Sequence, residues 1–137
     1  MDKTKITLIE DDKILSRVIN EELSEAGFDV SLAFDGEEGL EVVRSKKPDL
    51  ILLDLVMPKK NGFEVLEELK ASKETVNIPI IILTMLGQEE EVEKGLKLGA
   101  NQYVIKSQYA VIEIIDKIKD FLLHNSKTAS SQLNIQE

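Results

Sequence analysis

Short apolar runs recur along the chain, and amphipathic segments separate them. In the segments between the runs, apolar residues return at spacings of three and four, which predicts helices with one buried face. Two of the runs are apolar at every position, as expected of central parallel strands that are covered on both faces. The five predicted strands are Ile6–Ile9, Phe28–Ala33, Leu50–Leu53, Ile80–Leu83 and Tyr103–Ile105.

Local signals predict where the helices begin and end. Gly27 is expected to end the first helix, and Asp35 to cap a second helix that runs to about Ser45. The fourth helix, Glu89–Leu98, has acids in its first turn, lysines in its last turn and Gly99 behind it, which complements the helix dipole. The apolar faces of the first, third and fifth helices contain Ile14, Leu15, Val18, Ile19 and Leu23; Phe63, Leu66 and Leu69; and Val111, Ile114, Ile115, Ile118, Phe121 and Leu122.

Strands that alternate with single helices predict one doubly wound α/β domain. Right-handed crossovers between parallel strands place the helices on both faces of the sheet. The expected sheet is parallel, five-stranded and flavodoxin-like, with strand order 2-1-3-4-5. The domain is predicted to span residues 1–124. Residues 125–137 are polar and lose the helical periodicity, so we expect a flexible tail or the start of a linker there.

Composition and charge narrow the class of protein. The 137 residues suffice for one domain with a complete hydrophobic core. The absence of cysteine excludes disulfides and thiolate-bound metals. No segment has the length of a membrane span or a signal-peptide core, so a cytoplasmic protein without membrane contact is expected. The net charge of −9 argues against direct binding of nucleic acid. It fits a partner with a basic surface or a bound cation, but a solvated acidic surface is the commoner explanation.

Polar residues stand at the carboxyl ends of four predicted strands. Glu10–Asp12 follows the first strand, Asp54 the third, Thr84 the fourth and Lys106 the fifth. The carboxyl ends of parallel strands meet at one edge of the sheet, where open α/β sheets bind ligands. Taken singly, the first acids suit helix capping, the threonine suits a strand, and the lysine suits a solvated surface. Their combination at four strand ends predicts a functional site.

The acids in this set predict a site for a hard cation. Crowded carboxylates repel one another, and an oxygen-only ligand set suits Mg²⁺ better than zinc or copper. Asp11 and Asp54 are the expected carboxylate ligands, with the backbone carbonyl of Val56 as a third protein oxygen. Glu10 is expected to act through a water molecule, and Asp12 to cap the first helix.

Several short motifs follow one another in a characteristic order. Asp54 is followed by Met-Pro and then by Asn61-Gly62, and a Gly-Ala pair at 99–100 precedes Tyr103 and Lys106. Together with the acids after the first strand and the threonine after the fourth, this set resembles the receiver domain of response regulators. The resemblance covers roughly residues 4–124. Each motif is weak alone, but their order and spacing are specific.

The resemblance implies a function for each of these residues. Asp54 would accept a phosphoryl group from a sensor histidine kinase or a phosphotransfer protein, in a Mg²⁺-dependent reaction that the domain itself catalyses. Lys106 and Thr84 would contact the phosphoryl oxygens. Thr84 and Tyr103 would then switch the face formed by the fourth helix, the fifth strand and the fifth helix. A downstream protein target would bind that face, or a homodimer would form there on phosphorylation.

Four residues depart from the usual pattern of the family. Ser107 stands where many receivers have a cis proline, which leaves the geometry of the preceding peptide bond open. Met85 stands where a small residue is usual and is expected to narrow access to the phosphoryl site. Val56 and Leu86, each two residues beyond a site residue, offer no group to orient an attacking water. We therefore expect slow loss of the phosphoryl group.

Other readings of the chain have specific weaknesses. A phosphatase of the haloacid dehalogenase type needs a second acid where Val56 stands. A flavodoxin-like electron carrier needs a phosphate-binding loop where the acidic Glu10–Asp12 stands. A degenerate receiver that acts as a phosphorylation-independent interaction module is the remaining alternative. His124 could relay phosphate, but a histidine near a helix end more often complements the helix dipole.

Overall fold

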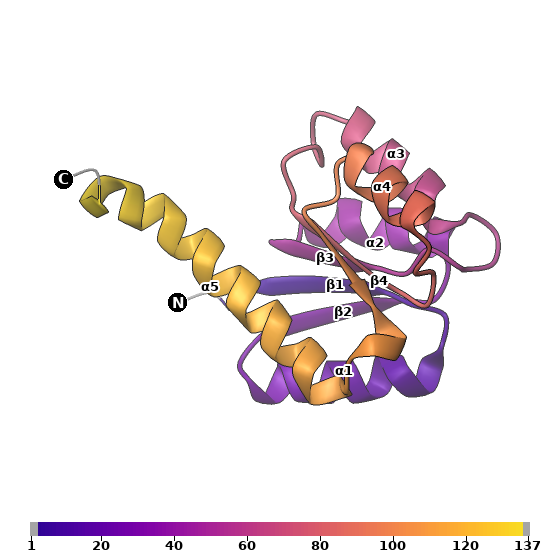
Figure 1. Cartoon of the computed structure of the whole chain (residues 1–137), viewed down its shortest axis with the longest axis horizontal. Coiled ribbons are helices and arrows are strands. Elements are labelled where there is room, and N and C mark those ends of the chain that lie inside the picture. Colours follow the sequence, from indigo (N-terminus) through magenta and orange to yellow (C-terminus); the bar gives the residue numbers. More distant parts are fainter. Residues whose placement is uncertain (1–2, 136–137) are drawn as a thin grey trace.

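A parallel sheet of five strands forms the centre of the molecule, with helices on both faces (Figure 1). The computed structural model describes residues 3–135. The strand order is β2-β1-β3-β4-β5, which confirms the predicted topology. The strands are β1 (Lys5–Ile9), β2 (Asp29–Ala33), β3 (Leu50–Leu53), β4 (Ile80–Thr84) and β5 (Gln102–Ile105). The helices are α1 (Lys13–Glu25), α2 (Gly36–Lys46), α3 (Gly62–Ala71), α4 (Glu89–Lys97) and α5 (Val111–Ile135), with a short 3-10 helix, η1 (Lys106–Gln108), between β5 and α5.

Two apolar layers hold the helices to the sheet. Successive side chains of a strand point to opposite faces, so each strand contributes to both layers. One layer packs under α2 and α3 and includes Ile9, Leu53 and Ile82. The other packs under α1 and α5 and includes Leu8 and Leu52. Because both faces are covered, β3 and β4 are buried at every position, as their unbroken apolar sequences predicted.

The helix boundaries follow from local hydrogen bonds. The Asp12 carboxylate accepts two backbone N–H groups of the first turn of α1, both at 3.1 Å. Asp35 accepts the backbone N–H of Glu38 at 2.8 Å at the start of α2. Both predicted caps are therefore confirmed. Gly27 and Gly99 have φ angles of 100° and 116°, a left-handed conformation that lets the chain turn after α1 and α4.

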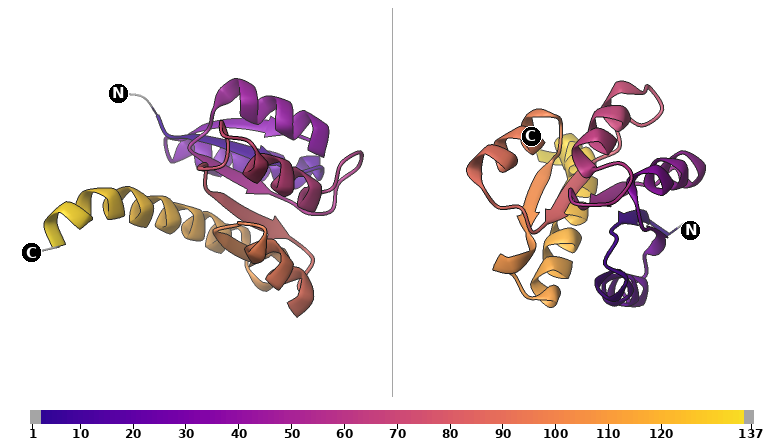
Figure 2. Two further views of the ribbon diagram at one scale, coloured as in Figure 1. Left: turned by 90° about the horizontal axis from the view of Figure 1, so that it is seen from above. Right: turned by 90° about the vertical axis from the view of Figure 1, so that its right-hand side faces the viewer.

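Helix α5 is longer than its apolar pattern predicted. It runs from Val111 to Ile135 and extends beyond the rest of the domain (Figures 1 and 2). Among its residues up to Asn125, whose side chains the structure describes, the buried ones are Ile114, Ile115 and Ile118. The backbone is therefore helical over most of the segment for which the sequence predicted a polar tail or linker, while the domain boundary at residue 124 stays a prediction. No helix in the described part of the chain has the length and apolarity needed to cross a membrane.

Candidate functional site

The carboxyl ends of four strands bring the predicted site residues to one edge of the sheet. Glu10 directly follows β1 and Asp54 directly follows β3, and the register pairs the residues that precede them. Thr84 ends β4 and is paired with the last residue of β5, after which Lys106 begins η1. Glu10, Asp54 and Thr84 are all buried, with exposed fractions of 1%, 5% and 0%. A helix cap or a solubilising charge would not need such burial.

Lys106 forms ion pairs with two acids of the site. Its Nζ lies 2.5 Å from Glu10 Oε1 and 3.4 Å from Asp54 Oδ2. The sequence predicted that the three residues share a crevice, but it did not predict the pair with Glu10. Since β3 and β4 lie between β1 and β5, only a long side chain can make this contact. Residues 3–135 contain no cis peptide bond, so the bond between Lys106 and Ser107 is trans.

The burial of these charges changes their protonation. The pKa of Glu10 is raised to about 7, chiefly by burial and also by the nearby Asp54 carboxylate, while Lys106 opposes both effects. Burial would lower the pKa of Lys106, but its contacts with the two acids hold that pKa above its ordinary value. Lys106 therefore remains a cation, and Glu10 is the member of the pair that titrates near neutral pH.

Three carboxylates form a set that fits a divalent cation. Glu10, Asp11 and Asp54 each offer one oxygen, and these oxygens lie within 4.8 Å of one another. Asp11 is exposed, whereas the other two acids are buried. An oxygen-only set of this kind suits a hard ion such as Mg²⁺ or Mn²⁺. The three acids that the sequence predicted at a cation site are thus close enough together to bind one.

Thr84 and Tyr103 both hydrogen-bond to the backbone of Leu86. Thr84 Oγ1 accepts the backbone N–H of Leu86 at 3.4 Å, and the Tyr103 hydroxyl donates to the Leu86 carbonyl at 2.7 Å. The pKa of Tyr103 is raised to about 12, chiefly by burial and also by the charges of Glu91 and Asp54. The phenol is therefore a stable hydrogen-bond donor. Every residue type except proline would offer the same backbone N–H and carbonyl here, so the sequence could not predict this link.

The loop after Asp54 is tied back to the site. The backbone N–H of Val56 donates to Asp54 Oδ1 at 3.3 Å, and the N–H of Gly62 donates to the Leu55 carbonyl at 2.9 Å. The Val56 side chain is 55% exposed, and Met85, in the loop after β4, is 61% exposed. Two apolar side chains that the sequence singled out thus lie at the surface beside the site.

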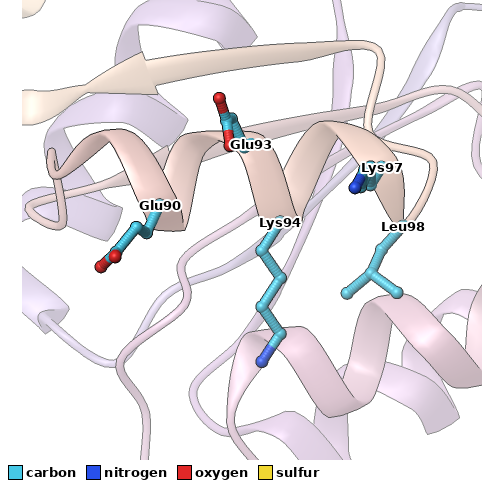
Figure 3. Close-up of a pocket in the computed structure, with 5 residues that line it drawn as sticks. All are labelled: Glu90, Glu93, Lys94, Lys97 and Leu98. Atoms are coloured by element: carbon cyan, nitrogen blue, oxygen red, sulfur yellow. The ribbon is translucent and has the colours of Figure 1, made fainter.

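A separate pocket lies on α4 (Figure 3). Lys94 extends from this helix toward α3, where its Nζ lies 4.3 Å from the centre of the Phe63 ring. Two acidic and two basic side chains line the pocket, so it presents no single charge to a ligand. The lining residues are Glu90, Glu93, Lys94, Lys97 and Leu98.

Comparisons with known sequences agree with this fold and site. The family model of the response regulator receiver domain matches residues 6–119. The DNA-binding dual master transcriptional regulator RpaA of a Synechocystis strain is 36% identical over 118 residues, which cover 86% of this chain and 48% of that protein. The response regulator ArlR of Staphylococcus saprophyticus is 37% identical over 119 residues, which cover 87% of this chain and 52% of that protein. The chain spans about half the length of the curated relatives it matches.

Solved structures of similar length give the same result. The Mn²⁺-bound form of response regulator Rcp1 superposes with a TM-score of 0.79 at 31% identity, covering 88% of this chain and 94% of that one. The phosphorylated cyanobacterial phytochrome response regulator RcpA superposes with a TM-score of 0.80 at 33% identity, covering 90% and 96%. The strand order, the acidic cluster at the strand ends and these matches lead to one conclusion: the chain belongs to the response regulator receiver domain family of two-component signalling.

Proposed function

We propose that this domain is the phosphoacceptor of a two-component system and that Asp54 is the residue phosphorylated. The observation that supports this most strongly is the position of Asp54 at the end of β3, within one cluster with Glu10, Asp11 and Lys106. The family implies a histidine kinase partner, and a sensor kinase or a phosphotransfer protein is the proposed donor. The relative RcpA is described in a phosphorylated form.

The proposed reaction transfers one phosphoryl group. An oxygen of the Asp54 carboxylate attacks phosphorus, the bond from phosphorus to the donor histidine nitrogen breaks, and an acyl phosphate forms. Lys106 is positioned to neutralise the incoming phosphoryl oxygens, because its Nζ already lies 3.4 Å from Asp54. Asp11, Asp54, the Val56 carbonyl and, through water, Glu10 would hold Mg²⁺, which offsets negative charge during transfer.

The proposed output begins at Thr84. If its hydroxyl bonds a phosphoryl oxygen, it no longer accepts the N–H of Leu86, the residue whose carbonyl accepts the Tyr103 hydroxyl. Tyr103 then repacks between α4 and β5, and the α4–β5–α5 face changes shape. A local charge would thereby produce a packing change that a downstream protein, or a second copy of the domain, can recognise.

The direct test is phosphorylation by a small acyl phosphate. The protein is incubated with Mg²⁺ and acetyl phosphate, and intact mass and peptide mapping locate any phosphoryl group. Wild type is expected to gain one base-labile group on Asp54, and Asp54→Asn to gain none there. Asp29→Asn is the matched control, because Asp29 is an exposed acid that begins the edge strand β2.

Two results would contradict the proposal. One is an unmodified wild type, which would favour the phosphorylation-independent interaction module. The other is equal labelling of Asp54→Asn at the same peptide. Size-exclusion chromatography of both forms would then show whether phosphorylation also drives formation of a homodimer.

A further inference from the structure

Gly36, the first residue of α2, touches the loop that follows Asp54. A Cβ atom at residue 36 would lie 2.0 Å from the carbonyl oxygen of Lys60 and 2.8 Å from its carbonyl carbon. These are backbone atoms, so no change of side-chain rotamer could relieve the overlap. Gly36 is itself buried. The approach of the loop to α2 therefore requires a residue without a side chain at this position.

The loop is also held on its other side. A Cβ atom at Gly62 would lie 2.3 Å from the Asp54 carbonyl oxygen, and the Gly62 N–H donates to the Leu55 carbonyl at 2.9 Å. Asn61 forms a reciprocal capping box with Glu64, which fixes the start of α3. The loop is thus confined between its own helix α3 and the N-terminus of α2.

Helix α2 is held more firmly against the sheet than the loop that follows Asp54. Leu40 and Val43 are buried against the sheet, and a Cβ atom at Gly39 would lie 2.7 Å from the Ile9 side chain. In contrast, Val56 in the loop is 55% exposed. A methyl group added at residue 36 would therefore displace the loop in preference to the helix.

We propose that Gly36 is a positioning residue for the cation site. Because Gly36 has no side chain, the Lys60 carbonyl can pack against it. This contact fixes the position of the loop and with it the position of the Val56 backbone beside Asp54. An ion pair between Lys59 and Asp35, at 3.7 Å, supports the same contact from the side chains. This inference rests on the proposed function, because it takes the Val56 carbonyl as a ligand of the cation.

The test measures binding of Mn²⁺ to the full chain by calorimetry. Gly36→Ala is expected to weaken binding by about tenfold, the lower end of the range for residues that orient metal ligands. Gly39→Ala is the matched control, because it adds the same methyl group to the same helix but meets the buried Ile9 side chain and not the backbone of the loop. We expect its affinity to stay within about twofold of wild type. Circular dichroism confirms that each variant is folded.

The outcomes separate this inference from the proposed function. A wild type that binds no Mn²⁺, or an Asp54→Asn variant that binds it equally well, overturns the cation site itself. If these two behave as expected but Gly36→Ala binds like wild type, only the role of Gly36 is overturned.

A second measurement avoids the substitution altogether and serves if Gly36→Ala does not fold. On titration of wild type with Mg²⁺, the amide resonances of Gly36 and Val56 are expected to shift together, with the same apparent Kd. A Gly36 amide that does not respond while that of Val56 does would contradict the inference.

Discussion

At the scale of single residues, Lys106 neutralises part of the acidic cluster before any ion or phosphoryl group arrives. It contacts both Glu10 and Asp54, and its pKa is raised by these contacts. Breaking a buried ion pair on one side commonly costs several kcal/mol, because the remaining charge loses its partner. Lys106 thus compensates the buried charge of these acids, in addition to its part in the proposed chemistry.

The residue two positions after Asp54 is expected to control how long the phosphoryl group persists. The side chain of Val56 cannot hydrogen-bond a water molecule, so wild type should release phosphate slowly. Val56→Asn introduces an amide that can orient water toward phosphorus, and we expect release to become roughly tenfold faster. The measurement is phosphate release from the purified phosphorylated domain. Val56→Leu, which remains apolar, should behave like wild type, and rapid release by wild type would refute the idea.

Tyr103 offers a pH-dependent prediction. The chain has two tyrosines and no tryptophan, so Tyr109→Phe leaves Tyr103 as the only phenol. Its pKa is raised to about 12, chiefly by burial, so the folded protein keeps a proton that the unfolded chain loses near pH 10. The contribution of Tyr103 to the free energy of unfolding is therefore fully present below pH 10 and is lost between about pH 10 and 12.

Absorbance of phenolate at 295 nm measures this titration directly. A midpoint near 12 is expected for folded Tyr109→Phe, and a midpoint near 10 would show that Tyr103 is accessible to water. Urea unfolding at several pH values between 9 and 12 checks the accompanying loss of stability.

Much of the site could be predicted from residue types at strand ends. Asp54, Asp11 and Glu10 follow apolar runs, and parallel strands bring such positions together. The pair between Lys106 and Glu10 could not be predicted in this way, because it depends on the direction of a long side chain. The approach of Gly36 to the Lys60 carbonyl depends on tertiary structure in the same way.

At the scale of secondary structure, α4 is the helix least anchored to the domain. Gly95 is its one buried residue, and it lies directly against Ile82 and the ring of Tyr103. Leu96, the next residue, is exposed. A helix with so little buried surface can shift with little loss of buried apolar area. This suits the proposed role of α4 in the switching face.

Substitution of Gly95 tests this arrangement. Alanine improves the intrinsic helix propensity by about 1 kcal/mol, so an unobstructed Gly95→Ala would stabilise α4. Here the new Cβ would lie 2.7 Å from Ile82 Cδ1 and 3.1 Å from Tyr103 Cε2. We expect overpacking to exceed the gain and to lower the free energy of unfolding by about 1 kcal/mol.

Urea unfolding followed by circular dichroism measures the effect of Gly95→Ala. Glu93→Ala is the control, since Glu93 lies on the exposed side of the same helix and should change stability by less than about 0.5 kcal/mol. A Gly95→Ala variant more stable than wild type would show that the space beside Tyr103 is open.

Helix limits were predictable where a side chain or glycine determines them. Asp12 and Asp35 cap their helices through short-range hydrogen bonds, which depend on local sequence alone. The end of α5 was less predictable. Its apolar stripe ends near Leu122, and no glycine or proline follows to terminate the helix, so periodicity indicates where packing ends but not where the backbone ceases to be helical.

At the scale of the whole molecule, the domain is predicted to need only residues 1–124. Among the residues of α5 up to Asn125, whose side chains the structure describes, the last that packs on the sheet side is Leu122. Removal of residues 125–137 should therefore change the free energy of unfolding by less than about 0.5 kcal/mol, as measured by urea denaturation. A loss much above that value would place the end of the domain beyond residue 124.

The long α5 helix also has a mechanical consequence. It starts at Val111, shortly after η1, which carries Lys106 at the acidic cluster. With 25 residues, the helix is about 37 Å long at 1.5 Å per residue. On such a lever, a tilt of about 5° at the base moves the far end by about 3 Å. A small tilt of α5 at its base, near the acidic cluster, would therefore produce a larger displacement at the C-terminal end of the helix.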